Sequence, residues 1–554
     1  GIEYSKTNIQ VSGVDEADIV KTDGKYIYLA SGDKVVIIEA YPPEELEVLT
    51  SIKVNGSVRG LFIYKNRLII ISTTYYHPKP VPPEPIKDVR EEREMSIAIA
   101  PAYWVNTTIY IYEISSVESP ALLANITASG NYLTSRMIDK YVYVIISQPL
   151  IKIYERIALP VINEKAVKPN DVKYFDNDYN FIFTTVISID VEEVRHEEEV
   201  FLLGTSSNIY VSTKNLYILS RKWISPYALM DQVVNSVLPM LPWGLRKSIA
   251  EVKSSDLPLH DKYSRISKFL SSWFNELPTD VKKDVMKRTF SIVSSVRVER
   301  TTIYRFSLKG LKVRAEAKGE VPGRVLDQFS MDEHEGYFRI ATTVTSPESS
   351  NNVYILDMDL NIVGRLEGLA RGERIYAARY LGDFMYLVTF RRVDPLFGIN
   401  LSDPSNPEVI GYLKVPGFSE YLHPYGDDYL IGIGRDADEL GRATGIKISL
   451  FDISNITNIK EASVVKLSGF WSPLFNDHKA FMMNEEKGYF AFPVLEGVVV
   501  VELKDGELEL RGISYHERAQ RSIYIGEYIY TISPELVRAI TEELAPISEV
   551  YIGI

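Results

Sequence analysis

A unit of four short apolar runs repeats along the chain, and this repeat restricts the possible folds more than any other feature. The unit is clearest between Pro416 and Gly469, where apolar and polar residues alternate over residues 420–425, 428–433, 447–453 and 462–467. A Gly-Asp turn, a polar loop and an Asn/Ser-rich turn separate the four runs. Alternation between turn signals is typical of β-strands, so the unit predicts a four-stranded antiparallel meander.

Nine such units follow one another within the 554 residues. Four-stranded sheets that bury both faces against neighbouring sheets must close into a ring. The repeat therefore predicts an all-β protein, a β-propeller of about nine four-stranded blades, with residues 1–554 forming a single body. Eight blades is the alternative, if one terminal unit shares its strands to close the ring. A row of separate β-sandwiches is the competing arrangement, and the regular spacing of the turns disfavours it.

The fourth unit is interrupted by a segment with a different period. Apolar residues recur there at helical spacing, at positions 266, 269, 270, 273, 274 and 277. Thr279-Asp280 after Pro278 marks the start of another helix, and a further helix is expected between Pro226 and Val237. The sequence thus predicts a helical insert over residues 222–296, with about four helices packed on the propeller. We interpret its apolar stripe as a core face, with a cofactor pocket as the weaker alternative.

The long interruptions all fall between the second and third strands of a unit, at residues 73–104, 148–180 and 221–298. In a propeller meander these connections emerge on one face, together with the links between blades. We call it the insertion-rich face. All five Trp lie in or beside segments assigned to it: Trp104, Trp223, Trp243, Trp273 and Trp471. Binding residues favour elaborated loops on rigid scaffolds, so this face is the candidate working surface. In the competing interpretation the inserts only cap the ring.

Charged and polar residues mark the starts of the first strands, which should point into the central channel on this same face. The candidate binding residues are Arg59, Arg136, Arg374, His423, Asp477, His478, Lys479, Arg518 and Arg521. Further polar residues accompany them: Asp15, Glu16, Asp18, Asp327, Gln328 and Glu420. Such a mixture is suited to a polar ligand or to acid/base chemistry, and equally to a structural network of ion pairs that closes the ring.

Composition excludes several classes of function. The net charge of −13 disfavours a general nucleic-acid binder, because binding to phosphates needs clustered Lys and Arg. No apolar run approaches 18 residues, so no membrane-spanning helix is expected. The absence of Cys removes disulfides and thiolate metal sites, and together with 36 Tyr it suits a thermophilic source.

No cofactor motif stands out. The seven His contain no HExxH motif, and GIGRD at residues 432–436 lacks the third glycine of a dinucleotide site. Asp436, Asp438 and Glu439 crowd three carboxylates into one loop, which makes them weak metal candidates beside the simpler interpretation of an exposed acidic turn. We predict no cofactor. Five Asn-x-Ser/Thr sequons suit a glycosylated surface protein, and they begin at Asn55, Asn106, Asn125, Asn400 and Asn455.

Four stretches carry a resemblance to a known family: residues 11–28 (VSGVDEADIVKTDGKYIY), 323–343 (GRVLDQFSMDEHEGYFRIATT), 393–436 and 476–481 (NDHKAF). The chain resembles the secreted archaeal and bacterial proteins described as having a C-terminal β-propeller distantly related to WD40 repeats. The resemblance spans nearly the whole chain. It implies a propeller fold and an extracellular or cell-surface location, and it supplies no catalytic residue.

Two functional hypotheses follow. The first is a cell-surface binding or assembly module whose insertion-rich face or strand edges contact a protein, a glycan or further copies of the chain in a lattice or filament. The second is an extracytoplasmic, metal-independent hydrolase or lyase with an acid/base site formed by His423, Asp477 and His478. An open pocket joining these three side chains would favour the enzyme, and an ion-paired plug would favour the module.

The ends of the chain must meet where the ring closes, because an open seam leaves unpaired backbone groups. Asn8–Val11 is expected to form an extra short strand before the first unit, and the C-terminal EVYIGI ends within a strand. We predict that at least one end pairs across the seam, within the molecule or by donation to a neighbouring copy.

Overall fold

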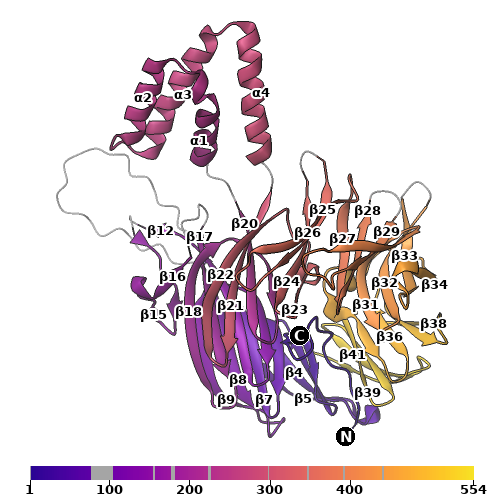
Figure 1. Ribbon diagram of the computed structural model, residues 1–554. Helices are drawn as coiled ribbons and strands as arrows, with labels where there is room; N and C mark the ends of the chain where they lie inside the picture. The colour runs from indigo at the N-terminus through magenta and orange to yellow at the C-terminus, as the bar shows by residue number, and fades with distance from the viewer. Residues whose placement is uncertain are drawn as a thin grey trace, which may run out of the picture.

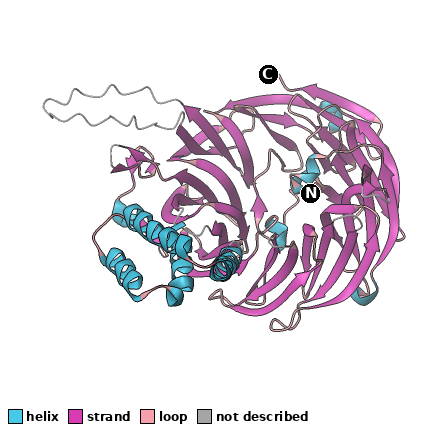
Figure 2. Ribbon diagram, turned by 90° about the horizontal axis from the view of Figure 1, so that it is seen from above, coloured by secondary structure: helices cyan, strands magenta, loops and turns pink. Residues whose placement is uncertain are grey.

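The computed structural model describes residues 2–76, 104–153, 156–175, 181–222, 226–296, 299–345, 348–390, 394–438 and 442–553. It is a β-propeller of nine blades, each containing a four-stranded antiparallel sheet, arranged as a ring (Figure 1, Figure 2). The prediction of nine blades is confirmed, and the alternative of eight is excluded. The four main strands of each blade come from one stretch of the chain, so none of these four-strand sets mixes strands from the two ends.

Within each blade the strands follow in sequence order from the inner strand to the outer one. Blade 1 contains β2 (Val20–Thr22), β3 (Tyr26–Ser31), β4 (Lys34–Glu39) and β5 (Glu47–Lys53). Blade 2 contains β6 (Ser57–Tyr64), β7 (Arg67–Tyr76), β8 (Trp104–Glu113) and β9 (Ala121–Ser129). Blade 3 contains β10 (Asn131–Ile138), β11 (Tyr141–Pro149), β17 (Phe181–Asp190) and β18 (Arg195–Gly204).

The middle three blades follow the same plan. Blade 4 contains β19 (Ser206–Val211), β20 (Asn215–Lys222), β21 (Arg300–Lys309) and β22 (Lys312–Pro322). Blade 5 contains β23 (Met331–His334), β24 (Tyr337–Val344), β25 (Ser350–Leu356) and β26 (Ile362–Leu369). Blade 6 contains β27 (Arg374–Leu381), β28 (Phe384–Phe390), β29 (Asp394–Asn400) and β30 (Glu408–Val415).

The last three blades complete the ring. Blade 7 contains β31 (Phe418–Tyr425), β32 (Tyr429–Ala437), β33 (Ala443–Asp452) and β34 (Lys460–Leu467). Blade 8 contains β35 (Met482–Asn484), β36 (Tyr489–Pro493), β37 (Gly497–Lys504) and β38 (Glu507–Tyr515). Blade 9 contains β39 (Arg521–Ile525), β40 (Tyr528–Ile532), β41 (Leu536–Thr541) and β42 (Pro546–Tyr551).

The cores lie between adjacent blades, because each sheet buries both of its faces. In β37 the four consecutive valines Val498 to Val501 are fully buried. Val499 and Val501 pack against blade 7, whereas Val498 and Val500 pack against blade 9. Side chains alternate across a strand, so a strand buried on both faces contains a continuous apolar run.

Short strands widen blades 2 and 3 within the second detour. A hairpin of β14 (Val161–Ile162) and β15 (Lys165–Ala166) extends the outer edge of blade 2, and β16 (Val172–Tyr174) extends that of blade 3. A separate pair is formed by β12 (Lys152–Ile153) and β13 (Arg156–Ile157).

The helical insert lies between β20 and β21, as the sequence predicted. It consists of α1 (Pro226–Val237), α2 (Trp243–Ser254), α3 (Leu259–Glu276) and α4 (Thr279–Val296). The insert stands above the ring as a bundle, and its buried core consists of its own residues, among them Val234, Ile249 and Ile266 (Figure 1). The interpretation of its apolar stripe as a core face is confirmed, with Ile266 buried and Phe269, Leu270 and Trp273 packed against the core of the bundle itself. None of the described helices is long and apolar enough to cross a membrane.

The N-terminus lies within the ring (Figure 2), and the N-terminal segment (residues 2–18) pairs first with blade 9 and then with blade 3. Tyr4 pairs with Ile525 of blade 9, and the Ser5 amide donates to the Tyr524 carbonyl at 2.9 Å. Further along, β1 (Asp15–Glu16) pairs with β10 of blade 3, before the chain enters blade 1. The prediction of pairing across the seam is confirmed for the N-terminus within one molecule.

The strand expected at Asn8–Val11 is absent from this segment. The segment uses side chains there: Asn8 donates to the Tyr421 hydroxyl at 2.7 Å and to the His478 carbonyl at 2.8 Å. The C-terminal run forms β42, the outer strand of blade 9, and contacts blade 1 through a hydrogen bond from the Ser548 hydroxyl to the Pro43 carbonyl.

Candidate functional site

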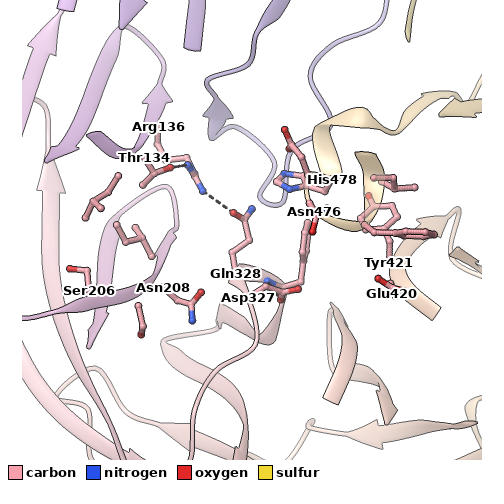
Figure 3. A pocket seen from close by; sticks show the side chains of 17 residues that line it. Thr134, Arg136, Ser206, Asn208, Asp327, Gln328, Glu420, Tyr421, Asn476 and His478 are labelled. Atoms are coloured by element: carbon pink, nitrogen blue, oxygen red, sulfur yellow. Dashed lines mark hydrogen bonds between the residues drawn. The ribbon is translucent and has the colours of Figure 1, made fainter. Parts of the chain in front are cut away.

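A cavity of about 360 Å³ opens at the mouth of the central channel. It is lined by residues at or just before the starts of the inner strands of blades 3, 4, 5, 7 and 8. Because β20 ends at the helical insert and β19 runs antiparallel to it, these strand starts lie on the insertion-rich face. Polar side chains from different blades line it, among them Arg136, Asn208, Gln328, Asn476 and His478. Those of Arg136 and Gln328 point toward each other (Figure 3).

A buried carboxylate, Glu16, lies beneath this cavity. Its Oε2 lies 3.1 Å from Nε2 of His478 and 3.7 Å from Arg136, and its Oε1 accepts from Gln328 at 3.0 Å. Burial opposes ionisation of Glu16, but Arg136 and His478 outweigh it and hold the pKa of the carboxyl far below its usual value. A hydrogen bond from Arg136 to Gln328, at 3.1 Å, completes this cluster (Figure 3).

A second cluster of charges continues across the seam. Arg521 forms a bidentate pair with Asp18 at 2.8–3.1 Å and also contacts Asp477 at 2.5 Å. Asp477 accepts from the Lys479 ammonium at 2.9 Å. Burial again opposes ionisation, but Arg521 and Lys479 hold the pKa of Asp477 far below its usual value. Together with Glu16, Arg136 and His478, these residues form what we call the channel plug.

A lower cavity of about 350 Å³ lies on the other side of the channel plug. Residues 4–7 of the N-terminal segment line it, together with Asp15 and Lys21, which pair at 2.8 Å. Lys479 and Arg521 of the channel plug also border this cavity. The channel is therefore divided by ion pairs into an upper and a lower pocket.

His423 lies apart from the upper cavity. Its side chain is buried against Phe481, and its Nδ1 forms a 2.9 Å hydrogen bond with the Tyr421 hydroxyl. Burial, reinforced by the Arg379 guanidinium, lowers the pKa of His423 well below its ordinary value, so the imidazole is neutral at neutral pH. Tyr421, Asp477 and His478 line the upper cavity, and His423 does not.

Asp327 lies in the wall of the cavity, where its side chain accepts hydrogen bonds from backbone amides. Its carboxylate caps a short helical turn by accepting from the amides of Phe329 at 3.0 Å and Ser330 at 3.2 Å. Burial raises the pKa of Asp327, although these hydrogen bonds oppose the shift. Sequence reasoning placed this residue at the channel, and its role here is to shape the wall.

The structure brings together five of the nine candidate binding residues and leaves four outside the channel plug. Arg136, Asp477, His478, Lys479 and Arg521 meet as described above. Arg59 is exposed and stacks on Tyr75, and Arg374 is exposed and stacks on Tyr376. Arg518 is exposed and pairs with Glu535 at 2.8 Å. His423 is the fourth, as shown above.

Sequence reasoning missed the neutral groups of the upper cavity. Ser206, Asn208 and Asn476 all line it. Within the described residues the Ser206 hydroxyl is buried without a hydrogen-bond partner, and the Asn208 amide donates to the Val325 carbonyl at 3.3 Å. Ser206 and Asn208 in unit four, and Asn476 in unit eight, lie near the start of the first strand of their unit. Charged residues occupy that position in other units, and this shared position is the signal that could have identified the three residues.

Two of the three weak metal candidates face a cation of the protein. Asp436 pairs with Lys466 at 3.0 Å, and Asp438 pairs with Arg442 at 2.8 Å. Glu439 lies outside the described residues. A different trio brings potential ligand atoms within 4.8 Å of one another on the opposite face: His334, Glu335 and Asp383.

The five sequons differ in their surroundings. Asn55 and Asn455 are exposed on turns, and Asn400 ends β29, where its side chain accepts from the Ser402 amide at 3.0 Å. Asn106 and Asn125 lie within β8 and β9. Four of the five Trp lie on the insertion-rich side as expected, and Trp223 lies outside the described residues.

Comparison with known proteins identifies archaeal relatives. An uncharacterised protein of Methanocaldococcus jannaschii is 32% identical over 550 residues, covering 96% of this chain and 80% of the relative. An uncharacterised protein of Archaeoglobus fulgidus is 30% identical over 571 residues, covering 97% of this chain and 83% of the relative.

A solved structure, the periplasmic gluconolactonase PpgL of Pseudomonas aeruginosa, aligns with a TM-score of 0.33 at 9% identity, over 67% of this chain and 95% of that one. The family model described as "Beta propeller domain" matches residues 4–543. With four-stranded blades observed along this whole range, the chain belongs to the β-propeller domain family.

Proposed function

We propose that this protein is an extracellular, cell-surface binding module that holds a polar segment of a protein or glycan in its upper channel mouth. The proposal rests on one observation: the charged groups of the channel mouth pair with other protein groups, whereas the neutral polar groups face the cavity. The charged side chains that line the cavity already have partners: Arg136, Asp477 and His478 within the channel plug, and Glu420 with Arg435 at 2.5 Å. The groups left to face a ligand are amides and hydroxyls, such as Ser206, Asn208 and Asn476.

This arrangement favours binding over acid/base chemistry. A general base must be free to accept a proton within hydrogen-bond reach of its substrate. The three residues of the enzymatic hypothesis are not joined by one pocket, because His423 is buried against Phe481, outside the upper cavity. Asp477 and His478 line that cavity, but Asp477 is paired with Arg521 and His478 faces Glu16. The filled plug therefore supports the binding module over the hydrolase or lyase.

The extracellular location is part of the proposal. It rests on the resemblance to secreted propeller proteins and on sequons at exposed turns, at Asn55 and Asn455. Fractionation of the producing cells with an antibody to the full chain tests this part directly. Recovery of the protein in the cytoplasmic fraction alone would contradict it.

A thermal-shift experiment tests the binding site. The full chain is heated with peptide and glycan fractions released from the envelope of the producing cells. A ligand at a hundred times its Kd should stabilise the protein by about 2.7 kcal/mol and raise its Tm. The double variant Asn208→Leu/Asn476→Leu should lose this response, because leucine keeps the size of asparagine and removes its hydrogen-bonding amide.

The matched control is Arg59→Ala/Arg374→Ala, which changes two exposed candidate residues outside the channel plug and should keep the response. Mass spectrometry of the bound fraction separates binding from catalysis. Recovery of the ligand unchanged supports the proposal. Conversion of the ligand, abolished by His478→Gln, would replace it with the enzymatic hypothesis.

A further inference from the structure

A second cavity, of about 550 Å³, lies on the outer part of blades 2 and 3, away from the central channel. Its walls come from the start of β8, from β9, from the β14–β15 hairpin and from the end of β11. The volume lies within the range of about 300–1,000 Å³ that small-molecule sites occupy. We call this cavity the outer groove.

Strand alternation places one aromatic and several polar side chains on the wall of the outer groove. Residues paired directly across two antiparallel strands share a face, and Asn106 pairs with Ser129 while Thr108 pairs with Thr127. Trp104 and Asn125 lie an even number of residues from these positions, and so belong to the same face. The intervening residues, such as Ile109, Ile126 and Ala128, pack into the core on the other face.

The far wall is held in place by hydrogen bonds. The β14–β15 hairpin turns at Asn163 and Glu164, both in the left-handed region with φ of 46° and 64°. Asn163 fastens this turn to β9 with two hydrogen bonds. Its side-chain Oδ1 accepts from the backbone amide of Thr127 at 3.0 Å, and its backbone amide donates to the Thr127 carbonyl at 2.8 Å. Such a wall is preformed, which lowers the cost of ordering a ligand site.

Gln148 is fixed in the same way from blade 3. Its Oε1 accepts from the Ser129 hydroxyl at 2.5 Å, and its Nε2 donates to the Ala158 carbonyl at 3.1 Å. Within the described residues, no side-chain hydrogen bond holds the amides of Asn106 or Asn125. Each of these two amides therefore has a donor and an acceptor available for a ligand.

From this geometry we propose that the outer groove binds a short neutral oligosaccharide. A Trp ring stacks on the apolar C–H face of a pyranose, and amides pair with its neighbouring hydroxyls as donor and acceptor at once. The polar groups of the lining are amides, hydroxyls and the Glu164 carboxylate, with no Lys, Arg or His among them. A cation would be required to pair with an acidic sugar, so uronic acids are disfavoured.

The proposal changes the interpretation of two sequons. Their hydroxyl residues, Thr108 and Thr127, hydrogen-bond to each other at 3.0 Å across β8 and β9. In the folded chain both sequons are thus fixed within a strand pair and are not presented on a loop. We infer that Asn106 and Asn125 recognise a sugar and do not carry one.

This inference rests on the proposed binding function, since a glycan is one of the partners proposed there, but it uses a different pocket. The experiment is calorimetric titration of the full chain with cellotriose, mannotriose, maltotriose and chitotriose, and with a glucuronic acid trimer as the anionic counter-probe. At least one neutral trimer should bind, and the anionic trimer should bind at least about tenfold more weakly.

Two variants locate the binding. Trp104→Ala and, independently, Asn125→Leu should each weaken binding of that trimer at least about tenfold, at unchanged Tm. Trp471→Ala is the control, because Trp471 is exposed on the same face of the ring and lies outside the outer groove. Asn208→Leu/Asn476→Leu should also leave this binding unchanged.

Three results would overturn the proposal. The first is that no neutral trimer binds at millimolar concentration. The second is equal binding by wild type and both groove variants, or loss of binding only in the channel-mouth variant. The third is a glycan found on Asn106 or Asn125 in protein purified from the producing cells. The first and third results, and equal binding by wild type and both groove variants, leave the channel-mouth proposal untouched. Loss of binding only in the channel-mouth variant would place the trimer there, supporting that proposal while it overturns this one, so the two proposals fail separately.

Discussion

Two ion pairs with the same N–O distance differ in burial, and burial decides how much each pair contributes to the free energy of unfolding. Arg521 contacts Asp18 at 2.8 Å, with the two side chains 6% and 5% exposed. Arg518 contacts Glu535 at the same distance, with exposures of 67% and 49%. An exposed pair is screened by water, whereas removing one member of a buried pair leaves an uncompensated charge.

Replacing Arg521 with Met should therefore lower the free energy of unfolding by about 3–5 kcal/mol, because Asp18 and Asp477 lose their shared cation. Arg518→Met is the matched control, with an expected loss below about 1 kcal/mol. Urea unfolding followed by near-ultraviolet circular dichroism measures both. The double variant Asp18→Asn/Arg521→Met should recover part of the loss. If Arg521→Met and Arg518→Met lower the free energy of unfolding equally, the buried pair contributes no more to stability than the exposed one.

Single residues also show where sequence reasoning reaches its limit. Charge near the start of an inner strand singled out Arg136, Asp477 and Arg521, which meet in the channel plug. The same pattern drew attention to Arg374, which is exposed and stacks on Tyr376. The pattern gives the position along the chain and does not give the partner, since Arg521 and Asp18 are 503 residues apart. Pairing at that separation depends on ring closure, which no local pattern contains.

The helical insert behaves as an element with its own core. Its buried residues, including Val234, Leu241 and Ile266, pack among themselves. The strands on either side of it pair directly, with Lys222 opposite Arg300. The two ends of the insert are therefore adjacent, and the propeller does not need the helices to bring β20 and β21 together.

Replacing residues 223–299 with a short Gly/Ser loop should leave a folded propeller with a Tm close to that of the full chain. Loop length has a small entropic cost, about 0.6 kcal/mol per doubling. Circular dichroism should show loss of the helical signal and retention of the strand signal. Ile266→Asp in the full chain is the companion variant, since it should unfold the bundle and spare the blades. An aggregated or unfolded deletion protein would mean that the helices are needed by the ring.

An element could be predicted from the sequence only where its apolar residues recur with a regular period. The insert was predictable because its apolar residues change from a period of two to a helical period within one unit. The β14–β15 hairpin was not, because each of its strands has two residues, and two residues carry no period. The outer groove depends on that hairpin, so the groove could not be inferred from the sequence even though Trp104, Asn106 and Asn125 were each noted.

The ring is closed by the N-terminal segment and by packing between blades 1 and 9. The segment adds backbone hydrogen bonds to the inner edge of blade 9, including one from the Gly526 amide to the Glu3 carbonyl at 2.7 Å. It then crosses to blades 7 and 8 through Asn8 and to blade 5 through Gln10, which donates to the Gln328 carbonyl at 2.7 Å. One short segment thus connects blades that are distant in the sequence.

Removing residues 1–12 should lower the Tm markedly, because it leaves the inner edge of β39 unpaired and removes the contacts of Asn8 and Gln10. Removing residues 1–2 alone is the control, since it keeps Glu3 and Tyr4 in place and should change the Tm little. An unpaired strand edge also accepts strands from other chains, so the longer truncation should associate with rising concentration, as measured by light scattering after size exclusion.

A synthetic peptide of residues 1–12 tests whether loss of the segment itself causes the lower Tm and the association of the truncated chain. If closure depends on the segment itself, adding the peptide should restore both the Tm and the monomeric state, whereas a peptide of the same composition in scrambled order should restore neither. The full chain should remain monomeric throughout, because its own segment already fills the edge. An unchanged Tm after removal of residues 1–12 would show that side-chain packing between blades 1 and 9, in the core that contains Ile38 and Ile532, closes the ring without the segment.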